Sequence, residues 1–387
     1  GSSLIDKYIK YNSILEALRL FDLLSVRNVV TWNMLIAGYA EQDGFSYDAY
    51  NCLMQMELDG ICPDDATFVG MLKASSATKH IEGGRIFHTE ILLRGLEREI
   101  SIGNTLIDMY AKCGYISEAG FIFKKMSMRT TVSWNAMIGA YIEHGFDQEG
   151  LNCFDQMESD GCAHNPVTLV CVLKACTNLN ISHRGKDIHI EMMQKGYERE
   201  IVLCSRLVDV YAKNGLMEEA WATSCELPFR DVILWNTLIS GYAEQDPGSK
   251  MLECMEKMQL EGVSPNNITF ANMLKGCFKC ESLDKCLMPL HIEIIMRGFE
   301  EDVFVGSSLV DMYVKHGSLL EAKIIFDRLL SKNIVSWTAL ISGYAEYGFN
   351  QEALKYFYQS ECQGISPNSV MFVSALRACN NTGCIKQ

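Results

Sequence analysis

The chain has 387 residues, of which 48% are hydrophobic and 21% charged, a globular composition that excludes a disordered or fibrous protein. Its formal net charge of −14 argues against a protein that holds nucleic acid through bulk positive charge, but not against one that reads exposed bases. No apolar run approaches the ~20 residues that span a bilayer, which argues against a membrane protein. The 16 cysteines are scattered along the chain and predict reduced thiols rather than a disulfide framework.

Three sequence motifs recur along the chain at an almost constant spacing. The first is centred on a tryptophan, and its four copies contain Trp32, Trp134, Trp235 and Trp337, which are 102, 101 and 102 residues apart. The second contains an Asp-x-Tyr segment with Asp6, Asp108, Asp209 and Asp311, at the same three spacings. The third carries Leu-Lys or Leu-Arg and begins at Phe68, Leu169, Phe270 and Phe372. The chain is therefore a block of about 101 residues, repeated, with three related repeats in each block.

Each repeat has the pattern of a helical hairpin. Trp32, Leu35, Ile36 and Tyr39 fall on one face of a helix, and the same face recurs after the other three tryptophans. A turn that contains glycine and a second amphipathic stretch follow, and Gly and Pro close the repeat, as in residues 60–63. A single hairpin cannot bury its apolar face, so neighbouring hairpins must stack. The sequence therefore predicts an all-α array of stacked hairpins.

These landmarks divide the chain into three types of repeat, named here by their motifs. The Trp repeats are residues 29–64, 131–165, 232–266 and 334–368. The Leu-Lys repeats are residues 65–99, 166–200, 267–302 and the partial 369–387. The Asp repeats are the partial 1–28 and residues 100–130, 201–231 and 303–333. Because both ends fall inside a repeat, we expect residues 1–387 to form a single array that belongs to a longer one.

The order and length of these repeats resemble the pentatricopeptide-repeat family. Repeats of 35, 35 and 31 residues carry the signatures WNxLIxGYAEQ, FxxxLKAC and xxLIDMYAKCG, and they alternate as the P, L and S motifs do in the plant organellar PLS subclass. The tetratricopeptide alternative has Gly directly after the Leu of its first helix, where this chain has Ile36, Ile138, Ile239 and Ile341. The resemblance implies a right-handed superhelical solenoid that binds single-stranded RNA, one base per repeat.

The resemblance places base recognition on a pair of polar residues in each Trp and Asp repeat. In a Trp repeat, one member follows the tryptophan and the other closes the repeat. Amides, hydroxyls and carboxylates differ in their donors and acceptors, so such pairs can discriminate base edges. The alternative is that the closing residues only cap the next helix. The pairs are Ser2/Asn28, Asn33/Asp64, Asn104/Thr130, Asn135/Asn165, Ser205/Asp231, Asn236/Asn266, Ser307/Asn333 and Thr338/Asn368.

The family's pairing rules predict the RNA target A-U-n-Y-C-n-G-C-n-A-A-n, read from the 5′ end. The letter Y marks the pair that closes with Thr130, which departs from the usual Asn or Asp and indicates only a pyrimidine. The letter n marks the Leu-Lys repeats, which we expect to read weakly or to bind an accessory protein, because an aliphatic side chain cannot hydrogen-bond a base. The base-facing residues of those repeats are Val69, Val170, Ala271 and Val373.

Two further sets of residues are candidates for RNA contacts. By resemblance, the residues two positions before each tryptophan sandwich the bases: Val30, Val132, Ile233 and Val335. One lysine sits at the same place in every Asp repeat: Lys10, Lys112, Lys213 and Lys315. These lysines either contact phosphates or belong to a solvated face. The Trp repeats have glutamate at the matching position, which predicts that affinity comes mainly from base contacts.

The sequence predicts no catalysis, no cofactor and no metal site. His88, His189 and His291 each begin an H-x-E segment, which also opens the zinc cytidine deaminase signature, and Cys277 and Cys280 form a C-x-x-C segment. The H-x-E segment recurs with the repeat, however, and the single C-x-x-C lacks the preceding proline of that signature. We therefore expect these residues to serve the repeat structure.

The resemblance also implies a cellular role. Arrays of the PLS class commonly continue into E and DYW regions, the latter a cytidine deaminase, and act in organellar C-to-U RNA editing. We expect this chain to be the target-recognition part of such a factor, in a mitochondrion or chloroplast. The alternatives are a helical scaffold that binds protein partners and an organellar factor for RNA stability or processing.

Overall fold

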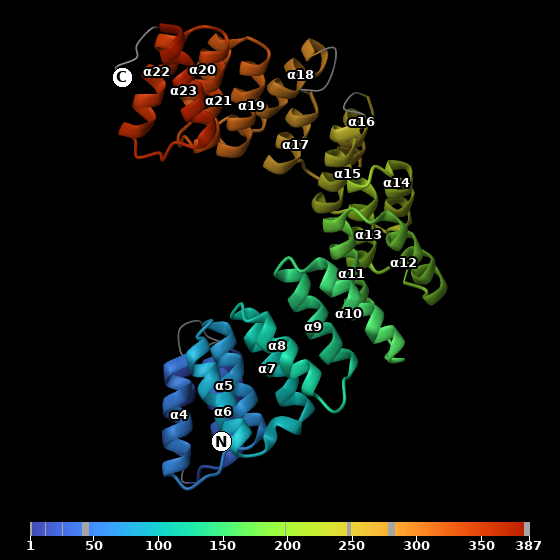
Figure 1. The fold of residues 1–387 in the computed structure, drawn as a ribbon, viewed down its shortest axis with the longest axis vertical. Helices are drawn as coiled ribbons and strands as arrows, with labels where there is room; N and C mark the ends of the chain where they lie inside the picture. The colour runs from blue at the N-terminus through green and yellow to red at the C-terminus, as the bar shows by residue number, and fades with distance from the viewer. Residues whose placement is uncertain are drawn as a thin grey trace. The chain divides into compact units, whose positions relative to one another are not determined.

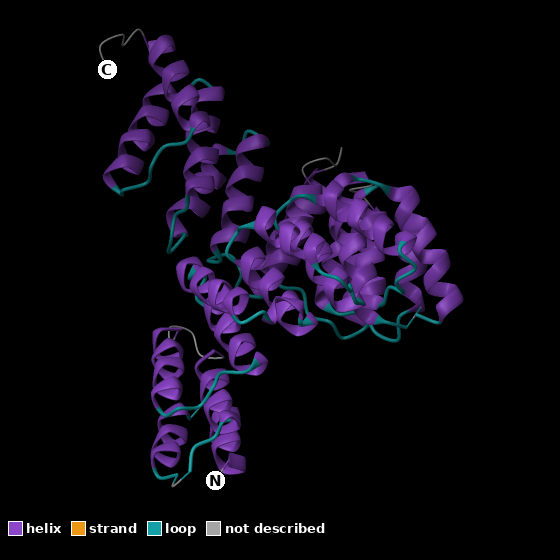
Figure 2. Ribbon diagram, turned by 60° about the horizontal axis from the view of Figure 1, so that its bottom comes forward, coloured by secondary structure: helices purple, strands orange, loops and turns teal. Residues whose placement is uncertain are grey.

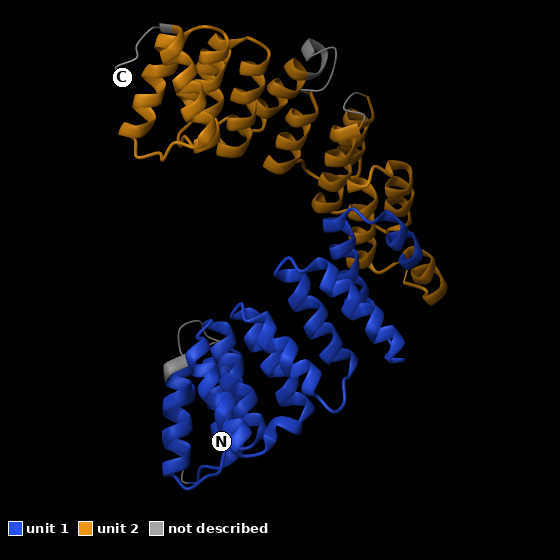
Figure 3. Ribbon diagram, in the orientation of Figure 1, with its two compact units in different colours: residues 1–188 blue, residues 189–387 orange. Residues whose placement is uncertain are grey.

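The computed structural model describes residues 2–11, 13–24, 26–40, 46–197, 199–245, 249–277 and 283–382. In these ranges every regular element is a helix (Figure 2), which confirms the all-α prediction. The chain forms two compact halves, residues 1–188 and 189–387 (Figure 3). Each half is a series of hairpins made of a first and a second helix.

The described residues of the N-terminal half form six first helices, which carry odd numbers: α1 (Ser2–Lys10), α3 (Val29–Ala40), α5 (Asp65–Ala77), α7 (Ile100–Lys112), α9 (Thr131–Glu143) and α11 (Pro166–Leu179). Figure 1 labels α5, α7, α9 and α11. The second helices of these hairpins are α2 (Ile14–Asp22), α4 (Ser46–Leu58), α6 (Ile81–Leu93), α8 (Ile116–Lys125), α10 (Asp147–Ser159) and α12 (Ser182–Lys195). The boundary between the halves, after Ile188, falls within α12. One 3₁₀-helix, Leu96–Arg98, precedes α7.

The C-terminal half repeats this order. Its first helices are α13 (Ile201–Lys213), α15 (Val232–Gln245), α17 (Asn267–Cys277), α19 (Val303–Lys315), α21 (Ile334–Glu346) and α23 (Ser369–Thr382). Its second helices are α14 (Met217–Glu226), α16 (Ser249–Leu260), α18 (Leu283–Met296), α20 (Leu319–Arg328) and α22 (Asn350–Cys362). From α3 onward, each first helix begins at the first residue of one of the repeats into which the sequence was divided.

The local sequence explains how each hairpin is built, as repeat 131–165 shows. Thr130 caps α9 by accepting a hydrogen bond from the backbone N–H of Ser133. Trp134 and Ile138 are buried on the inner face of α9. Gly145 then turns the chain into α10 with φ of 78°, a left-handed conformation that side chains other than glycine's rarely adopt.

Within each half the first helices pack against one another in sequence, so they form a continuous row. Most second helices pack against their own first helix and against the first helix of the next hairpin. Aromatic side chains join an Asp repeat to the following Trp repeat: the rings of Phe123 and Trp134 meet edge to face with centroids 4.8 Å apart, and Phe326 and Trp337 repeat the contact at 4.7 Å. The periodic tryptophans are therefore core residues.

Two negative findings hold for the part of the chain that the structure describes. None of its helices combines the length and the apolar character needed to cross a membrane. Its cysteines form no disulfide with one another, several of them are buried, and burial raises the pKa of Cys153 to about 12.

Candidate functional site

The paired residues of the first complete Trp repeat meet in the structure. Asn33 lies on α3, and Asp64 caps the N-terminus of α5. The Asn33 amide nitrogen Nδ2 donates a hydrogen bond of 2.9 Å to Asp64 Oδ1. Thr67, in the first turn of α5, donates its backbone N–H to the same Asp64 oxygen at 2.9 Å and its hydroxyl to Asn33 Oδ1 at 2.6 Å. The two predicted residues and Thr67 therefore form a closed ring of hydrogen bonds.

These hydrogen bonds also set the charge of the Asp64 carboxyl. Burial by itself raises the pKa of a carboxyl group. The hydrogen bonds from the Asn33 amide and from the Thr67 backbone N–H outweigh burial and lower the pKa of Asp64 below its ordinary value of 3.8. Asp64 is therefore a carboxylate at neutral pH and acts only as an acceptor.

The same ring recurs in the next two Trp repeats. Asn135 donates to Asn165 Oδ1 at 3.1 Å, and Asn236 donates to Asn266 Oδ1 at 3.2 Å. Thr168 and Thr269 take the place of Thr67, and each donates its hydroxyl to the first-helix asparagine at 2.6 Å.

Two other pairs are joined differently. In the fourth Trp repeat, Asn368 Nδ2 donates to the Thr338 hydroxyl at 3.0 Å, so the closing residue is the donor. In the Asp repeat 303–333, the Ser307 hydroxyl lies 3.0 Å from Asn333 Oδ1 and 2.5 Å from the Val303 carbonyl. The donor and acceptor pattern presented by each pair therefore varies with the residue types, although the backbone is the same.

The remaining predicted pairs are not joined by a direct hydrogen bond in the described residues. Ser205 donates to the Ile201 carbonyl, while Asp231 accepts the Leu234 backbone N–H. Asn104 has a buried Oδ1 without a hydrogen-bond partner, and Thr130 caps α9.

One predicted pair lies partly outside the described part of the chain. Asn28 accepts the backbone N–H of Thr31 at 3.0 Å and so caps α3. The side chain of its predicted partner Ser2 lies outside the described residues, so that pair stays a prediction.

An exposed aliphatic side chain precedes the first-helix member of each Trp pair by three residues. Val30, Val132, Ile233 and Val335 are 52–69% exposed, although each has a buried tryptophan two positions later. Equivalent exposed residues, which the sequence reasoning missed, occur in other repeats: Val167, Val202, Ile268, Phe304 and Val370. The sequence feature that could have identified them is an apolar residue at the position in the repeat that Val30 occupies. An aliphatic surface in contact with water beside a polar pair suits a flat ligand that has polar edges.

Two surface pockets of the C-terminal half contain these residues. One, of about 310 Å³, lies between α13, α15 and α17 and is lined by Ile233, Asn236 and Lys213 among others. The other, of about 320 Å³, lies between α17, α19 and α21 and is lined by Ser307, Val335 and Lys315. Each brings an exposed aliphatic residue, a member of a predicted polar pair and one of the predicted lysines to a single surface.

The four predicted lysines are each paired with an acid on their own helix. Lys112 Nζ lies 3.0 Å from Asp108, and Lys315 Nζ lies 2.7 Å from Asp311. Lys10 and Lys213 make the same contact with Asp6 and Asp209, at 2.7 and 3.5 Å. In these exposed pairs the aspartate offsets the charge of the lysine, and phosphate contact by the lysines stays a prediction.

The H-x-E histidines contact tyrosine. His88 Nδ1 lies 2.9 Å from the Tyr110 hydroxyl, and His189 and His291 make the same contact with Tyr211 and Tyr313 at 2.9 and 2.7 Å. Each contact joins a Leu-Lys repeat to the next Asp repeat. No group of three metal-ligating side chains occurs within the described ranges, and the position of Cys280 lies outside them.

These histidines predict an acid-sensitive fold. Burial lowers the pKa of His88, His189 and His291 below the ordinary 6.5, so at pH values just under 6.5 the unfolded chain binds protons that the folded chain does not. Stability should therefore be full above pH ~6.5 and fall as the pH drops toward the lowered values. Thermal unfolding between pH ~7.5 and ~5.5 tests this. Replacing all three histidines by glutamine should make the unfolding temperature depend less on pH in this range. An unchanged pH dependence would contradict the prediction.

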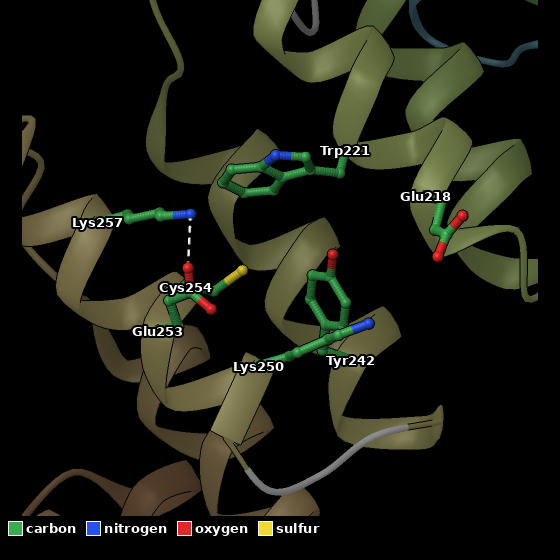
Figure 4. Close-up of a pocket in the computed structure, with 7 residues that line it drawn as sticks. All are labelled: Glu218, Trp221, Tyr242, Lys250, Glu253, Cys254 and Lys257. Atoms are coloured by element: carbon green, nitrogen blue, oxygen red, sulfur yellow. Dashed lines mark ion pairs between the residues drawn. The ribbon is translucent and has the colours of Figure 1, made fainter.

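A further pocket, of about 260 Å³, lies between the second helices α14 and α16 and the first helix α15 (Figure 4). Its lining includes Trp221, Tyr242 and Cys254. The Lys257 ammonium lies 4.4 Å from the Trp221 ring centroid and 2.7 Å from Glu253, so its charge is neutralised within the pocket. The pocket contains none of the predicted base-recognition residues and is separate from the candidate site.

Comparisons with known proteins agree with this geometry. A family model described as the PPR repeat family matches residues 27–76 and 230–279. A PPR repeat model matches residues 104–129, 132–162, 202–223, 307–334 and 335–365. Together the matches cover more than half of the chain.

Full-length relatives extend well beyond the chain. A mitochondrial pentatricopeptide repeat-containing protein of Arabidopsis thaliana is 34% identical over 389 residues, covering 100% of this chain and 38% of its own length. A chloroplastic one from the same plant is 34% identical over 382 residues, covering 98% of this chain and 61% of its own length. The chain therefore spans only part of the relatives that it matches.

Solved structures show the same fold. The pentatricopeptide repeat protein PPR10 from maize matches with a TM-score of 0.50 at 18% identity, covering 100% of this chain and 72% of that one. PPR10 in complex with an 18-nt psaJ RNA element matches with a TM-score of 0.54 at 17% identity, covering 98% of this chain and 76% of that one. On its repeats, its relatives and its fold, the chain belongs to the pentatricopeptide repeat family.

Proposed function

We propose that the chain binds single-stranded RNA and reads it one base per repeat. The observation that carries the proposal is the recurring site of the Trp repeats, in which a hydrogen-bonded polar pair stands beside an exposed aliphatic side chain. A base has the complementary form, with two apolar faces and an edge of donors and acceptors. The complex of the similar protein PPR10 with an RNA element supports the same class of ligand.

The proposed target is A-U-n-Y-C-n-G-C-n-A-A-n, and base contacts supply most of the specificity. The net charge of −14 and the pairing of the predicted lysines with aspartates favour binding that depends on base identity more than on bulk charge. At the positions marked n, the aliphatic residues of the Leu-Lys repeats, such as Val170, offer no hydrogen bond to a base. These repeats read weakly or bind an accessory protein.

We further propose that the array is the target-recognition part of a C-to-U RNA editing factor in a mitochondrion or chloroplast. The alternation of three repeat types, similar to that of the P, L and S motifs, supports this role. The mitochondrial and chloroplastic relatives support the compartment.

Competition binding with short RNAs tests the proposed function. An RNA of the proposed register should bind much more tightly than one in which C-G-C at the fifth, seventh and eighth positions is replaced by G-C-G, because each lost edge match costs about 1–3 kcal/mol. A duplex of the same sequence should compete poorly, since its edges are already paired. Equal affinity for all three RNAs, or no RNA binding together with capture of a protein partner, would overturn the proposal.

A further inference from the structure

Three buried threonines complete the polar pairs of the first three full Trp repeats. Thr67, Thr168 and Thr269 are 0% exposed and belong to the next hairpin, three residues after the closing residue. Each donates its backbone N–H to the closing residue and its hydroxyl to the first-helix asparagine, so one residue holds both members of the pair.

The chemistry of the ring fixes which way each asparagine points. The Thr168 backbone N–H can only donate, so the Asn165 atom that it contacts at 3.1 Å is the oxygen Oδ1. Asn135 must then face that oxygen with its amide nitrogen, which leaves Asn135 Oδ1 toward the Thr168 hydroxyl, 2.6 Å away. A flipped Asn135 amide would set two acceptor oxygens against each other, and it would also turn its nitrogen toward the Thr168 hydroxyl, which would lose its acceptor. The ring therefore leaves one Asn135 N–H in a defined direction for a ligand.

We propose that Thr67, Thr168 and Thr269 are specificity-determining positioning residues, whose hydroxyls lock the first-helix asparagine so that its free amide N–H meets the base edge in one orientation. The inference rests on the proposed RNA-binding function and adds a third residue to each two-residue reading pair. Because the threonines are fully buried, they do not touch RNA, and they act on base choice only through the asparagine.

The chain itself contains repeats that lack this lock. Met371 occupies the position equivalent to the threonine after Asn368, and Leu234 occupies it after Asp231. Neither side chain has a hydrogen-bond donor. The first-helix partners in these two repeats are Thr338 and Ser205. The repeat of Asn104 has Ser133 at this position, whose hydroxyl is engaged with Thr130 while Asn104 Oδ1 stays without a partner. The full ring therefore occurs in the repeats where an asparagine follows tryptophan.

The test replaces Thr168 by valine, which keeps the backbone N–H and the branched shape but removes the hydroxyl. The measurement is the ratio of affinities for RNAs with C or A at the fifth position, the base assigned to Asn135 and Asn165. We expect this ratio to fall about 2- to 10-fold, the effect of one hydrogen bond between neutral groups. The ratios at the other positions should not change. T168S, which retains a hydroxyl, should restore the wild-type ratio.

The matched control is S133A. It removes the equivalent capping hydroxyl, which accepts the Thr130 backbone N–H at 3.1 Å but does not contact Asn104. Thermal unfolding should report similar small losses for S133A and T168V, while only T168V changes base choice. If T168V weakened the binding of all RNAs alike, or changed base preference no more than S133A does, the threonine would act only as a helix cap and the inference would be wrong. If the wild-type chain bound no RNA with preference, the proposed function itself would have failed.

Discussion

Replacing Trp134 by alanine should destabilise the chain by about 3–5 kcal/mol, the usual effect of removing a large aromatic side chain from a core. Trp134 is 1% exposed and packs edge to face on Phe123 of the preceding hairpin. The Arg129 guanidinium lies 5.8 Å from the centroid of the Trp134 ring and 5.0 Å from that of Phe123. The substitution therefore removes a contact that joins two hairpins as well as one that holds α9.

Hydrogen exchange is the appropriate measurement, because repeat arrays are stabilised by contacts between neighbours and can unfold in parts. Protection should be lost first in α8 and α9. The control is V132A on the same helix, which removes an exposed side chain and should change stability by less than ~0.5 kcal/mol. Similar losses for W134A and V132A would contradict the assignment of Trp134 to the core.

The helices and their core could be predicted from the sequence because the apolar period was repeated many times. A single amphipathic stretch is ambiguous, whereas four copies of Trp-x-x-Leu/Met-Ile-x-x-Tyr average out local exceptions. The buried residues of α9 and α21, including Trp134, Ile138 and Trp337, follow that face.

The sequence reasoning treated helix capping and base reading as alternatives for the closing residues, and the structure shows that a closing residue can cap a helix and contact its first-helix partner at once. Asp64 Oδ1 accepts the backbone N–H of Thr67 as a cap and, through the same atom, the side-chain N–H of Asn33. The role of Thr67 could not be predicted from periodicity, because its hydroxyl meets a residue 34 positions away. Its only local signal was the spacing of a capping box.

The lysines show a different limit of the sequence reasoning. Their constant place in the Asp repeats suggested a shared role, but the same motif places an aspartate four residues earlier, one helical turn away, as in Asp108 and Lys112. That spacing was visible in the sequence and favours an ion pair on the helix surface. The lysine side chains are 44–71% exposed, so a phosphate has access to them while the ion pair holds them in place.

Replacing Thr338 by asparagine should move the preferred base at the penultimate position of the target from A toward C. In the native pair Asn368 Nδ2 donates to the Thr338 hydroxyl, whereas in the Asn135 pair the first-helix residue is the donor. The substitution changes the group that we propose to face the base from a hydroxyl to an amide. The preference between RNAs that differ only at this base should change by about 1–3 kcal/mol, measured by competition binding.

The structure adds a condition to this substitution. Asn368 is followed by Met371, which donates its backbone N–H to Asn368 Oδ1 but has no hydroxyl to hold an introduced asparagine. The double variant T338N/M371T supplies that donor and should favour C more strongly than T338N alone, while M371T alone should leave the preference for A unchanged. Equal weakening of every RNA by T338N would show that Thr338 is structural and that the proposed register is wrong. If T338N shifted the preferred base toward C and adding M371T did not strengthen the shift, the proposed RNA register would stand. The proposed role of the threonines would then be wrong, because only that role depends on the residue at position 371.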